Sequence, residues 1–269
     1  MANISWLYYK DYFNGIRFDV HKFGEDGNNI KLVKAKNTKI TKAKLTVIEN
    51  PCAKQKIKTI VQYPGLVTGI GINHEASIQE EFKLGLHFDY TYGMPVIYGS
   101  SVKGLLRSAF PVREKETEID KLVKIRNAKT SIIKNYLGKG FENIDVDKLR
   151  AHIFDGIKNI KEDNTIEYFS IYERDVFFDA VIIKPNKKNM ILASDSITPH
   201  KNNPLQEPVP ITFLKIASGC TLEFRFDLKT STIDGIEVSA ACKLALFKNI
   251  LRDFGIGAKT NVGYGQLNA

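Results

Sequence analysis

The strongest constraint on the fold of this chain is an amphipathic segment, residues 237–254, that runs directly into a glycine-rich segment, residues 255–267. Apolar residues recur along the first segment at the spacing of an α-helix, which predicts a helix with one face against a core. Gly255 stands where a glycine often ends a helix, because glycine adopts a positive φ at little cost. The sequence therefore predicts a helix that leads directly into a loop.

The glycine-rich segment is typical of a phosphate-binding loop. Glycines allow another backbone to approach closely and leave main-chain N–H groups exposed, and such groups bind anions. A lysine and a threonine lie in the same segment and add a charge and a hydroxyl. The candidate phosphate-binding residues are Gly255, Gly257, Lys259, Thr260, Gly263 and Gly265.

This loop does not match the common nucleotide-binding motifs. A P-loop has a glycine directly before its lysine and another glycine five residues earlier. Here those positions hold Ala258 and Asp253, and no strand is expected before the loop. The dinucleotide fingerprint G-x-G-x-x-G fails as well, because His74 occupies the position of its third glycine. An NTPase or a Rossmann-type enzyme is therefore disfavoured.

A second anion-binding element is expected after Gly99. Serine is a favoured N-cap residue, so the sequence predicts a helix that starts at Ser100 or Ser101. A helix N-terminus attracts anions through its free N–H groups and its dipole. Lys103 and Arg107 are four residues apart and lie on one face of this helix, where they would add positive charge. The alternative is a capped helix with two solvated basic side chains.

The charge of the chain points to an acidic partner. The 269 residues carry a formal net charge of +9, which favours nucleic acid or another anionic surface. Residues 31–58 contain nine lysines against the single acid Glu49, a net charge of +8 in one window. Lysine without arginine suggests attraction to phosphates rather than bidentate recognition of bases. A solvated loop or edge is the alternative reading of this window.

Tyrosines beside glycines and basic residues offer a second mode of nucleic-acid binding. Unpaired bases stack on exposed aromatic rings. Half-buried tyrosines at turns are the alternative. The candidates are Tyr90, Tyr92, Tyr98 and Tyr264.

Helices and strands alternate in a way that predicts an α+β fold, in which helices pack on one face of a mainly antiparallel sheet. We expect one domain over residues 1–269, with a helical insertion over 112–165 and the basic segment at 31–58. Expected strands lie in 39–48, 66–72, 171–183, 190–193, 211–216 and 220–227, and residues 82–98 are expected to form a strand, a turn at Gly93 and a short strand. Residues 211–216 and 220–227 are expected to form a hairpin across Ser218 and Gly219.

No cofactor or metal is expected. Cys52, Cys220 and Cys242 are far apart and form no C-x-x-C pair. Asp89, Asp175, Asp179 and Asp195 show no spacing that separates a metal site from surface acids. No apolar run approaches the roughly 18 residues of a membrane span, and no signal-peptide pattern is visible, so we expect a soluble, cytoplasmic protein.

The five histidines also lack a metal-ligand spacing. His74 and His87 are nevertheless candidates for a general acid or base that acts on a ribose hydroxyl, as in metal-independent ribonucleases. Isolated histidines more often have structural or surface roles.

Two stretches together resemble the RAMP superfamily of CRISPR-associated proteins. Residues 93–107, GMPVIYGSSVKGLLR, are similar to its motif G-x-P-x-I-P-G-S-S-x-K-G-x-L-R, except that Tyr98 replaces the proline before Gly-Ser-Ser. The glycine-rich residues 255–265 are similar to the C-terminal loop of the superfamily. Three further stretches resemble the family of sixth subunits of type III-B (Cmr) effector complexes, namely residues 69–74, 84–89 and 195–214.

The resemblance implies a modified RRM-like (ferredoxin-like) βαββαβ core with insertions. It also implies a non-catalytic backbone subunit of a ribonucleoprotein complex in antiviral defence, because cleavage of target RNA in this family belongs to another subunit. The implied partners are guide RNA (crRNA), target RNA and other Cmr subunits. The implied RNA-binding positions are Ser100, Ser101, Lys103, Arg107 and the loop residues given above. An endoribonuclease that processes precursor guide RNA and an assembly subunit that mainly contacts protein are the alternatives.

Overall fold

A computed structural model describes residues 3–69, 76–82, 86–111, 119–163, 165–198 and 210–268, without the side chains of 119–121. Its centre is one antiparallel sheet, to which strands from distant parts of the sequence contribute. In sheet order these strands are β12 (Leu267–Asn268), β1 (Gln55–Val61), β9 (Thr221–Asp227), β6 (Ala180–Lys184) and β2 (Val96–Ile97), and β5 (Val176–Phe177) also pairs with β9.

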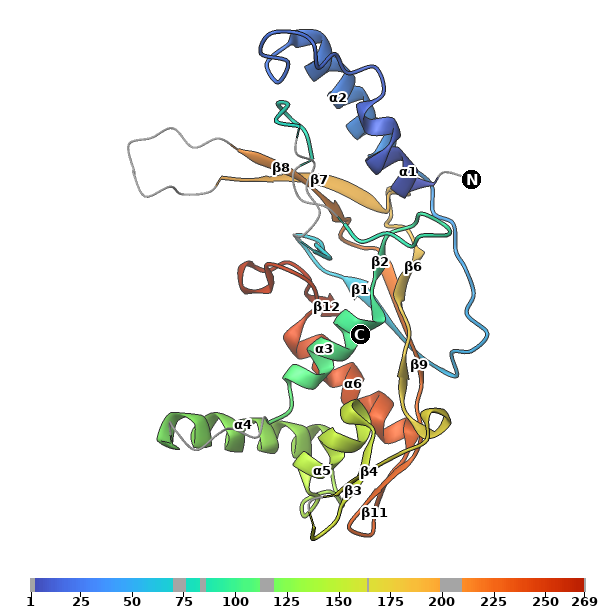
Figure 1. The fold of residues 1–269 in the computed structure, drawn as a ribbon, viewed down its shortest axis with the longest axis vertical. Helices are drawn as coiled ribbons and strands as arrows, with labels where there is room; N and C mark the ends of the chain where they lie inside the picture. Colours follow the sequence, from blue (N-terminus) through green and yellow to red (C-terminus); the bar gives the residue numbers. More distant parts are fainter. Residues whose placement is uncertain are drawn as a thin grey trace.

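Helices α3 (Gly99–Ser108) and α6 (Ala240–Phe254) pack against this sheet and against each other (Figure 1). Aromatic rings fill the space between sheet and helices, with Phe247 of α6 lying 5.6 Å from Phe226 and 5.8 Å from Phe177 between ring centroids. Such rings bury large apolar areas and dominate the energetics of a core. The sheet and these two helices form the centre of the molecule.

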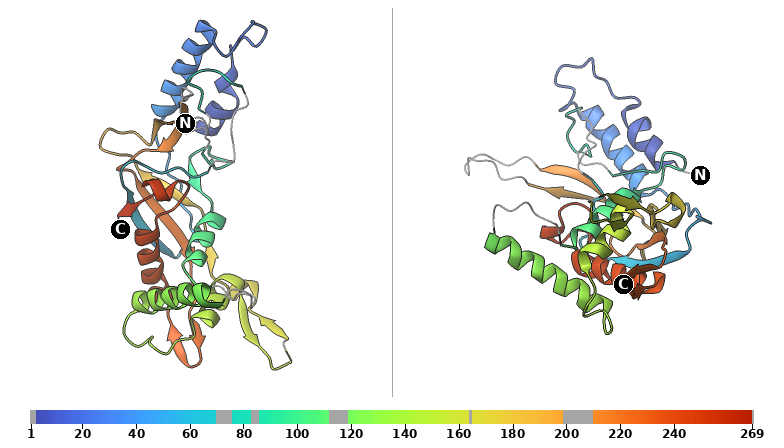
Figure 2. Two further views of the ribbon diagram at one scale, coloured as in Figure 1. Left: turned by 90° about the vertical axis from the view of Figure 1, so that its left-hand side faces the viewer. Right: turned by 60° about the horizontal axis from the view of Figure 1, so that its bottom comes forward.

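The remaining elements extend the molecule at both ends of the sheet (Figures 1 and 2). At one end lie α1 (Ile4–Tyr9), η1 (Asp11–Phe13) and α2 (Gly27–Thr41), next to a hairpin of β7 (Leu192–Ile197) and β8 (Ile211–Ile216). At the other end lie α4 (Ile119–Leu137), α5 (Val146–Arg150), η2 (Ala151–Asp155), β3 (Ile157–Ile160), β4 (Ile166–Tyr168), η3 (Ile171–Glu173), β10 (Ser231–Ile233) and β11 (Ile236–Val238). A short turn, η4 (Thr260–Val262), lies in the glycine-rich loop.

The α+β class and the antiparallel sheet are confirmed, as is the helix that ends at Gly255. This helix starts three residues later than expected, because the hydroxyl of Ser239 caps it by accepting a hydrogen bond from the Cys242 N–H, 3.2 Å away. Gly255 ends the helix with φ +67° and donates its N–H to the Leu251 carbonyl. None of the described helices combines the length and apolarity needed to cross a bilayer.

The strand expected over 39–48 is wrong. Helix α2 continues to Thr41, and the residues that follow it form no strand. The helix forms here because Asp26 accepts hydrogen bonds from the N–H groups of Asn28 and Asn29, both at 3.0 Å. This N-terminal cap lies outside the window in which the alternation was found.

The hairpin expected between 211–216 and 220–227 is also wrong. Strand β8 pairs with β7, whereas β9 lies between β1 and β6. The turn between them separates the two strands, because the Ala217 N–H bonds the Ile191 carbonyl and the Gly219 N–H bonds the Val61 carbonyl at 2.8 Å. The residues at Ser218 and Gly219 thus predicted the turn correctly, but they do not determine which strands β8 and β9 pair with.

Three other expected strands are shorter than their windows. In 66–72, Leu66 and Val67 form single bridges to Ile216 and Ala258, and residues 70–72 lie outside the described residues. In 82–98, of which residues 83–85 lie outside the described part, the described residues form the single strand β2 after a turn at Gly93. In 171–183 the turn η3 precedes β5, because Ser170 and Glu173 form a reciprocal capping box.

Candidate nucleic-acid interface

The glycine-rich loop is fastened to the chain segment that follows β1. The Ile256 N–H bonds the Gly265 carbonyl at 2.9 Å and closes the loop at its base. From there the Gly265 N–H bonds the Gly65 carbonyl and the Ala258 N–H bonds the Val67 carbonyl, both at 2.8 Å. The loop is therefore held on both sides by backbone hydrogen bonds.

The glycines of the loop have different roles. Gly255 and Gly265 are buried, and a Cβ on Gly255 would lie 2.8 Å from the Gly265 carbonyl oxygen. The absence of side chains at these two positions allows the two ends of the loop to approach each other closely. Gly257 is exposed at φ +98° and faces the Val67 carbonyl so closely that a side chain would collide with it. Gly263, at φ +95°, ends the turn η4.

The exposed part of the loop offers a row of free donors. Within the described part of the chain, the N–H groups of Gly257, Lys259, Thr260 and Asn261 donate to no acceptor. Lys259 has φ +61° and is followed by the turn η4, so left-handed and right-handed conformations succeed one another. Alternation of this kind turns successive N–H groups toward one point and creates an anion-binding concavity.

Tyr264 anchors the loop to the β7–β8 hairpin. Its hydroxyl donates to Oδ2 of Asp195 at 2.8 Å, and the same carboxylate pairs with Lys215. Its ring lies edge-on to Phe213 with centroids 5.8 Å apart. Burial and then the bond to Asp195 raise the pKa of Tyr264 to about 12. Tyr264 is buried and therefore does not offer a face to a base.

Helix α3 starts one residue earlier than expected, and its serines are not the cap. Tyr98 is the N-cap, and the Gly99 N–H donates to Oδ1 of Asp179 at 2.7 Å. Ser100 and Ser101 are exposed on the first turn. The sequence gives no sign of this contact, because Asp179 comes from the connection between β5 and β6, 80 residues later.

The two basic residues of α3 are held by neighbours. The ammonium of Lys103 lies 5.8 Å from the centroid of the Phe177 ring, within the range of a cation–π contact. Arg107 is exposed and pairs with Asp155 of η2 at 2.8 Å. Both side chains remain within reach of solvent, but the charge of Arg107 is partly balanced.

His87 lies between the loop and α3. Its ring stacks on Tyr98 with centroids 4.5 Å apart and an interplanar angle of 15°. The main-chain N–H of His87 donates to the Thr68 hydroxyl at 2.9 Å. Thr68 follows Val67, to which the glycine-rich loop is bonded. The two sequence motifs are thus connected through His87. Burial lowers the pKa of this histidine, which favours the neutral ring. His74 lies outside the described residues.

The basic window 31–58 is divided between two places. Its first part lies in α2 at one end of the molecule, and its last part lies in β1 at the centre (Figure 1). Several of its lysines pair with acids, such as Lys36 and Lys39 with Asp11 at 3.1 and 3.0 Å. Within the described residues, the exposed lysines of this window without an ion pair are Lys31, Lys42, Lys44 and Lys58.

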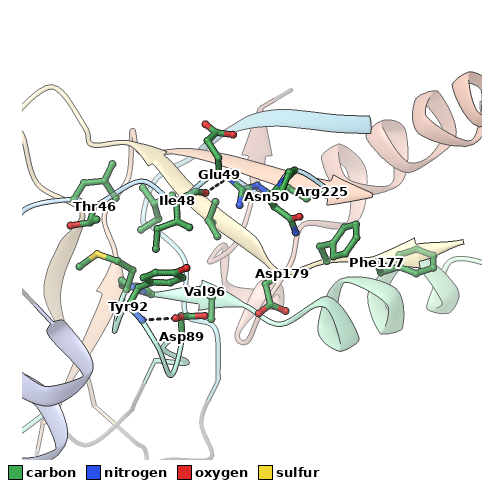
Figure 3. Close-up of a pocket in the computed structure, with 17 residues that line it drawn as sticks. Thr46, Ile48, Glu49, Asn50, Asp89, Tyr92, Val96, Phe177, Asp179 and Arg225 are labelled. Carbon is green, nitrogen blue, oxygen red and sulfur yellow. Dashed lines mark hydrogen bonds between the residues drawn. The ribbon is translucent and has the colours of Figure 1, made fainter. Parts of the chain in front are cut away.

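A pocket of about 430 Å³ opens between the loop before β1 and strands β2 and β6 (Figure 3). Asp89 and Asp179 line it, and Arg225 is buried at its edge. The Arg225 guanidinium is engaged in contacts within the chain, because it pairs with Glu223 at 2.9 Å and donates to the Ile48 carbonyl at 2.7 Å. The carboxylates make this pocket a poor site for phosphate. In the described part of the chain, no three acidic, histidine or cysteine residues gather as metal ligands would.

Comparison with known proteins identifies the family. The family model of the RAMP superfamily matches residues 60–268. The chain belongs to the RAMP superfamily. The match confirms the family resemblance of residues 93–107 and 255–265, because both motifs lie inside the matched range.

Among individual proteins, the RAMP chain is similar to the CRISPR system Cmr subunit Cmr6 of Pyrococcus furiosus, with 28% identity over 239 residues. The alignment covers 75% of this chain but only 64% of that relative. A chain in the cryo-EM structure of the Type III-B Cmr-beta complex bound to cognate target RNA is 21% identical, with a TM-score of 0.47 and coverage of 79% and 57%. The crystal structure of Cmr6 from Pyrococcus furiosus gives 22% identity, a TM-score of 0.39 and coverage of 79% and 96%.

Proposed function

We propose that this RAMP protein is a non-catalytic guide-RNA-binding backbone subunit of a type III-B CRISPR ribonucleoprotein complex that acts against foreign RNA in the cytoplasm. The observation that carries the proposal is the set of N–H groups of Gly257, Lys259, Thr260 and Asn261, which donate to no acceptor within the described residues, on a loop that is linked to the start of helix α3 through His87. The similarity to a subunit named Cmr6 supports a CRISPR effector role. Guide RNA, target RNA and other Cmr subunits are the proposed partners.

The topology of the sheet supports an RRM-like core. The units β1, α3, β6, β9, α6 and β12 follow one another as βαββαβ, and the order of these strands in the sheet is β12-β1-β9-β6. Each neighbouring pair is antiparallel. We therefore propose a ferredoxin-like core, with β2, β5 and the elements between α3 and β5 as additions.

In the proposed complex the loop binds the RNA backbone. The free N–H groups of Gly257, Lys259, Thr260 and Asn261 would donate to phosphate oxygens, and the Lys259 ammonium would supply charge. Lys103, Ser100 and Ser101 would contact the next part of the strand along α3. Contacts of this kind position an RNA without recognising its sequence.

Salt-dependent RNA binding tests this proposal. Affinity for single-stranded RNA is measured between about 50 and 200 mM salt for the wild type, Lys259→Ala and the double variant Lys103→Ala with Arg107→Ala. Each variant is expected to weaken binding to all sequences and to lower the salt slope by about 0.7 per lost phosphate contact. Lys161→Ala, an exposed lysine after β3, serves as the control. Unchanged slopes in all variants would contradict the phosphate assignment, and a wild type that binds no RNA would favour the assembly subunit.

A metal-independent endoribonuclease is the second candidate, because His87 lies between the two motifs. Among the residues that the structure describes, its buried Nδ1 has no hydrogen-bond partner, and a neutral imidazole is suited to accept a proton. Incubation of the chain with a repeat-containing transcript in EDTA separates the two functions. A backbone subunit leaves the transcript intact, whereas specific cleavage that disappears in His87→Ala or His74→Ala would establish the enzyme.

A further inference from the structure

Tyr63 is an aromatic side chain without an evident structural role. Its residue is 86% exposed, whereas most large apolar side chains around it are buried. Within the described part of the chain it makes no ring contact, ion pair or hydrogen bond with another side chain. Such exposure of an aromatic ring does not stabilise the folded chain.

The backbone on both sides of Tyr63 is fixed to the glycine-rich loop. The Gln62 N–H bonds the Gln266 carbonyl at 2.9 Å, and the Gly65 carbonyl accepts from Gly265 at 2.8 Å. Pro64 lies against Gly263, since a Cβ on that glycine would come 3.7 Å from the proline Cδ. The ring is therefore presented from a fixed backbone rather than from a mobile loop.

The loop to which this backbone is fixed combines an apolar surface with anion donors. Val262, the last residue of η4, is 64% exposed. The free N–H groups of Gly257, Lys259, Thr260 and Asn261 belong to the same loop. A nucleotide has the same two parts, because its base is flat and largely apolar on its faces while its phosphate is an anion.

We propose that Tyr63 is a stacking platform for one unpaired base of the RNA whose phosphate is bound by residues 257–261. This inference rests on the proposed RNA-binding function. Stacking on a tyrosine face tolerates every base, so Tyr63 adds affinity and fixes the register of the strand without selecting a sequence. Tyr172 lacks this setting, since it is 83% exposed but lies in η3.

The test compares Tyr63→Ala, Tyr63→Phe and the matched control Tyr172→Ala in the full chain. The probe is a single-stranded RNA that carries one fluorescent 2-aminopurine, moved along the strand. We expect Tyr63→Ala to weaken binding roughly five- to hundredfold with an unchanged salt slope. Tyr63→Phe and Tyr172→Ala should bind like the wild type, and only Tyr63→Ala should abolish the quenching of the stacked base.

The outcomes separate this inference from the proposed function. If Tyr63→Ala binds and quenches like the wild type while Lys259→Ala lowers the salt slope, the stacking platform is wrong and the phosphate site stands. If the wild type binds no RNA, both are overturned. If Tyr63→Phe loses affinity as Tyr63→Ala does, the hydroxyl rather than the ring face is responsible, and stacking is overturned.

Discussion

The hydroxyl of Tyr264 donates a hydrogen bond to Oδ2 of Asp195 at 2.8 Å, which links the glycine-rich loop to the β7–β8 hairpin. Tyr264→Phe removes this bond and keeps the ring against Phe213. A single hydrogen bond to a charged acceptor makes a modest net contribution, so we expect the free energy of unfolding to fall by about 1–2 kcal/mol. Urea denaturation measures it, with the exposed Tyr172→Phe as the control. An unchanged midpoint would show that the link does not stabilise the fold.

The pairing of Asp11 with Lys36 and Lys39 makes stability depend on pH. Burial opposes ionisation of this carboxyl, but hydrogen bonds from Lys39 and Lys36 outweigh it, so its pKa lies below the usual range. A lowered pKa in the folded state means that folding favours the carboxylate. The resulting stability is present above the unfolded pKa of about 4 and is lost as the pH falls through the folded value.

We therefore expect Asp11→Asn to reduce the free energy of unfolding at pH 7 by about 1 kcal/mol. The difference from the wild type should shrink as the pH falls below about 4, because the wild-type carboxyl is protonated first in the unfolded state and, at lower pH, in the folded state as well. Urea denaturation over a pH series checks this. A difference that stays constant from pH 7 to pH 3 would contradict the ion-pair explanation.

The pair of Lys243 and Asp175 lies in the core, with side chains 1% and 2% exposed and 2.6 Å between Nζ and Oδ2. Lys243→Met leaves the Asp175 carboxylate buried without its partner, which should cost roughly 3–5 kcal/mol. The double variant with Asp175→Asn removes both charges, while the new amide oxygen can still accept the Lys229 N–H that Asp175 accepts. It should recover most of the loss in thermal denaturation. A double variant as unstable as the single one would show that packing, not charge, dominates.

Two glycines should respond in opposite ways to alanine. Gly257 has φ +98° and faces the Val67 carbonyl, so Gly257→Ala should destabilise the loop and weaken RNA binding severalfold. Gly104 lies exposed in α3 with open space where a Cβ would be, so Gly104→Ala should stabilise the helix by roughly 0.5–1 kcal/mol.

Melting temperature and RNA affinity are measured for both variants. If RNA lies against α3, Gly104→Ala should also weaken binding, since the added methyl group keeps the backbone away. Equal effects of the two substitutions on stability would contradict the assigned backbone conformations.

The sequence predicted the parts of the fold that depend on local patterns. The helix before Gly255 and the turn around Gly93 were predicted, because helical periodicity and the position of a glycine are properties of a short stretch of sequence. The strand partners of β8 and β9 were not predicted, because strand partners are chosen by packing over the whole chain. The alternation in 39–48 misled for a different reason, since the cap at Asp26, outside that window, starts a helix that continues to Thr41.

The assignment of the candidate site residues stays a prediction, and their contacts could not be predicted. Lys259 and Thr260 are half-buried, whereas Gly255 and Gly265 are buried. Asp179, which occupies the first N–H of α3, and Asp155, which pairs with Arg107, come from distant elements. No short sequence motif predicts these two contacts. Nothing in the sequence singled out Tyr63 either, because the hydrogen bonds of Gln62 and Gly65 to the glycine-rich loop join residues about 200 positions apart.

Strand β1 has consequences for how the chain reaches this fold. It lies between β9 and β12, and even the side chain of Gln55 accepts from the Leu228 N–H, 173 positions away. Strand β1 therefore has no sheet partner until strands in the last third of the chain have formed, which favours slow folding. Because loop-closure entropy grows only logarithmically, doubling the intervening length adds just about 0.6 kcal/mol. The region that contains α4, α5 and the β3–β4 hairpin is thus free to change in length while the sheet keeps its register.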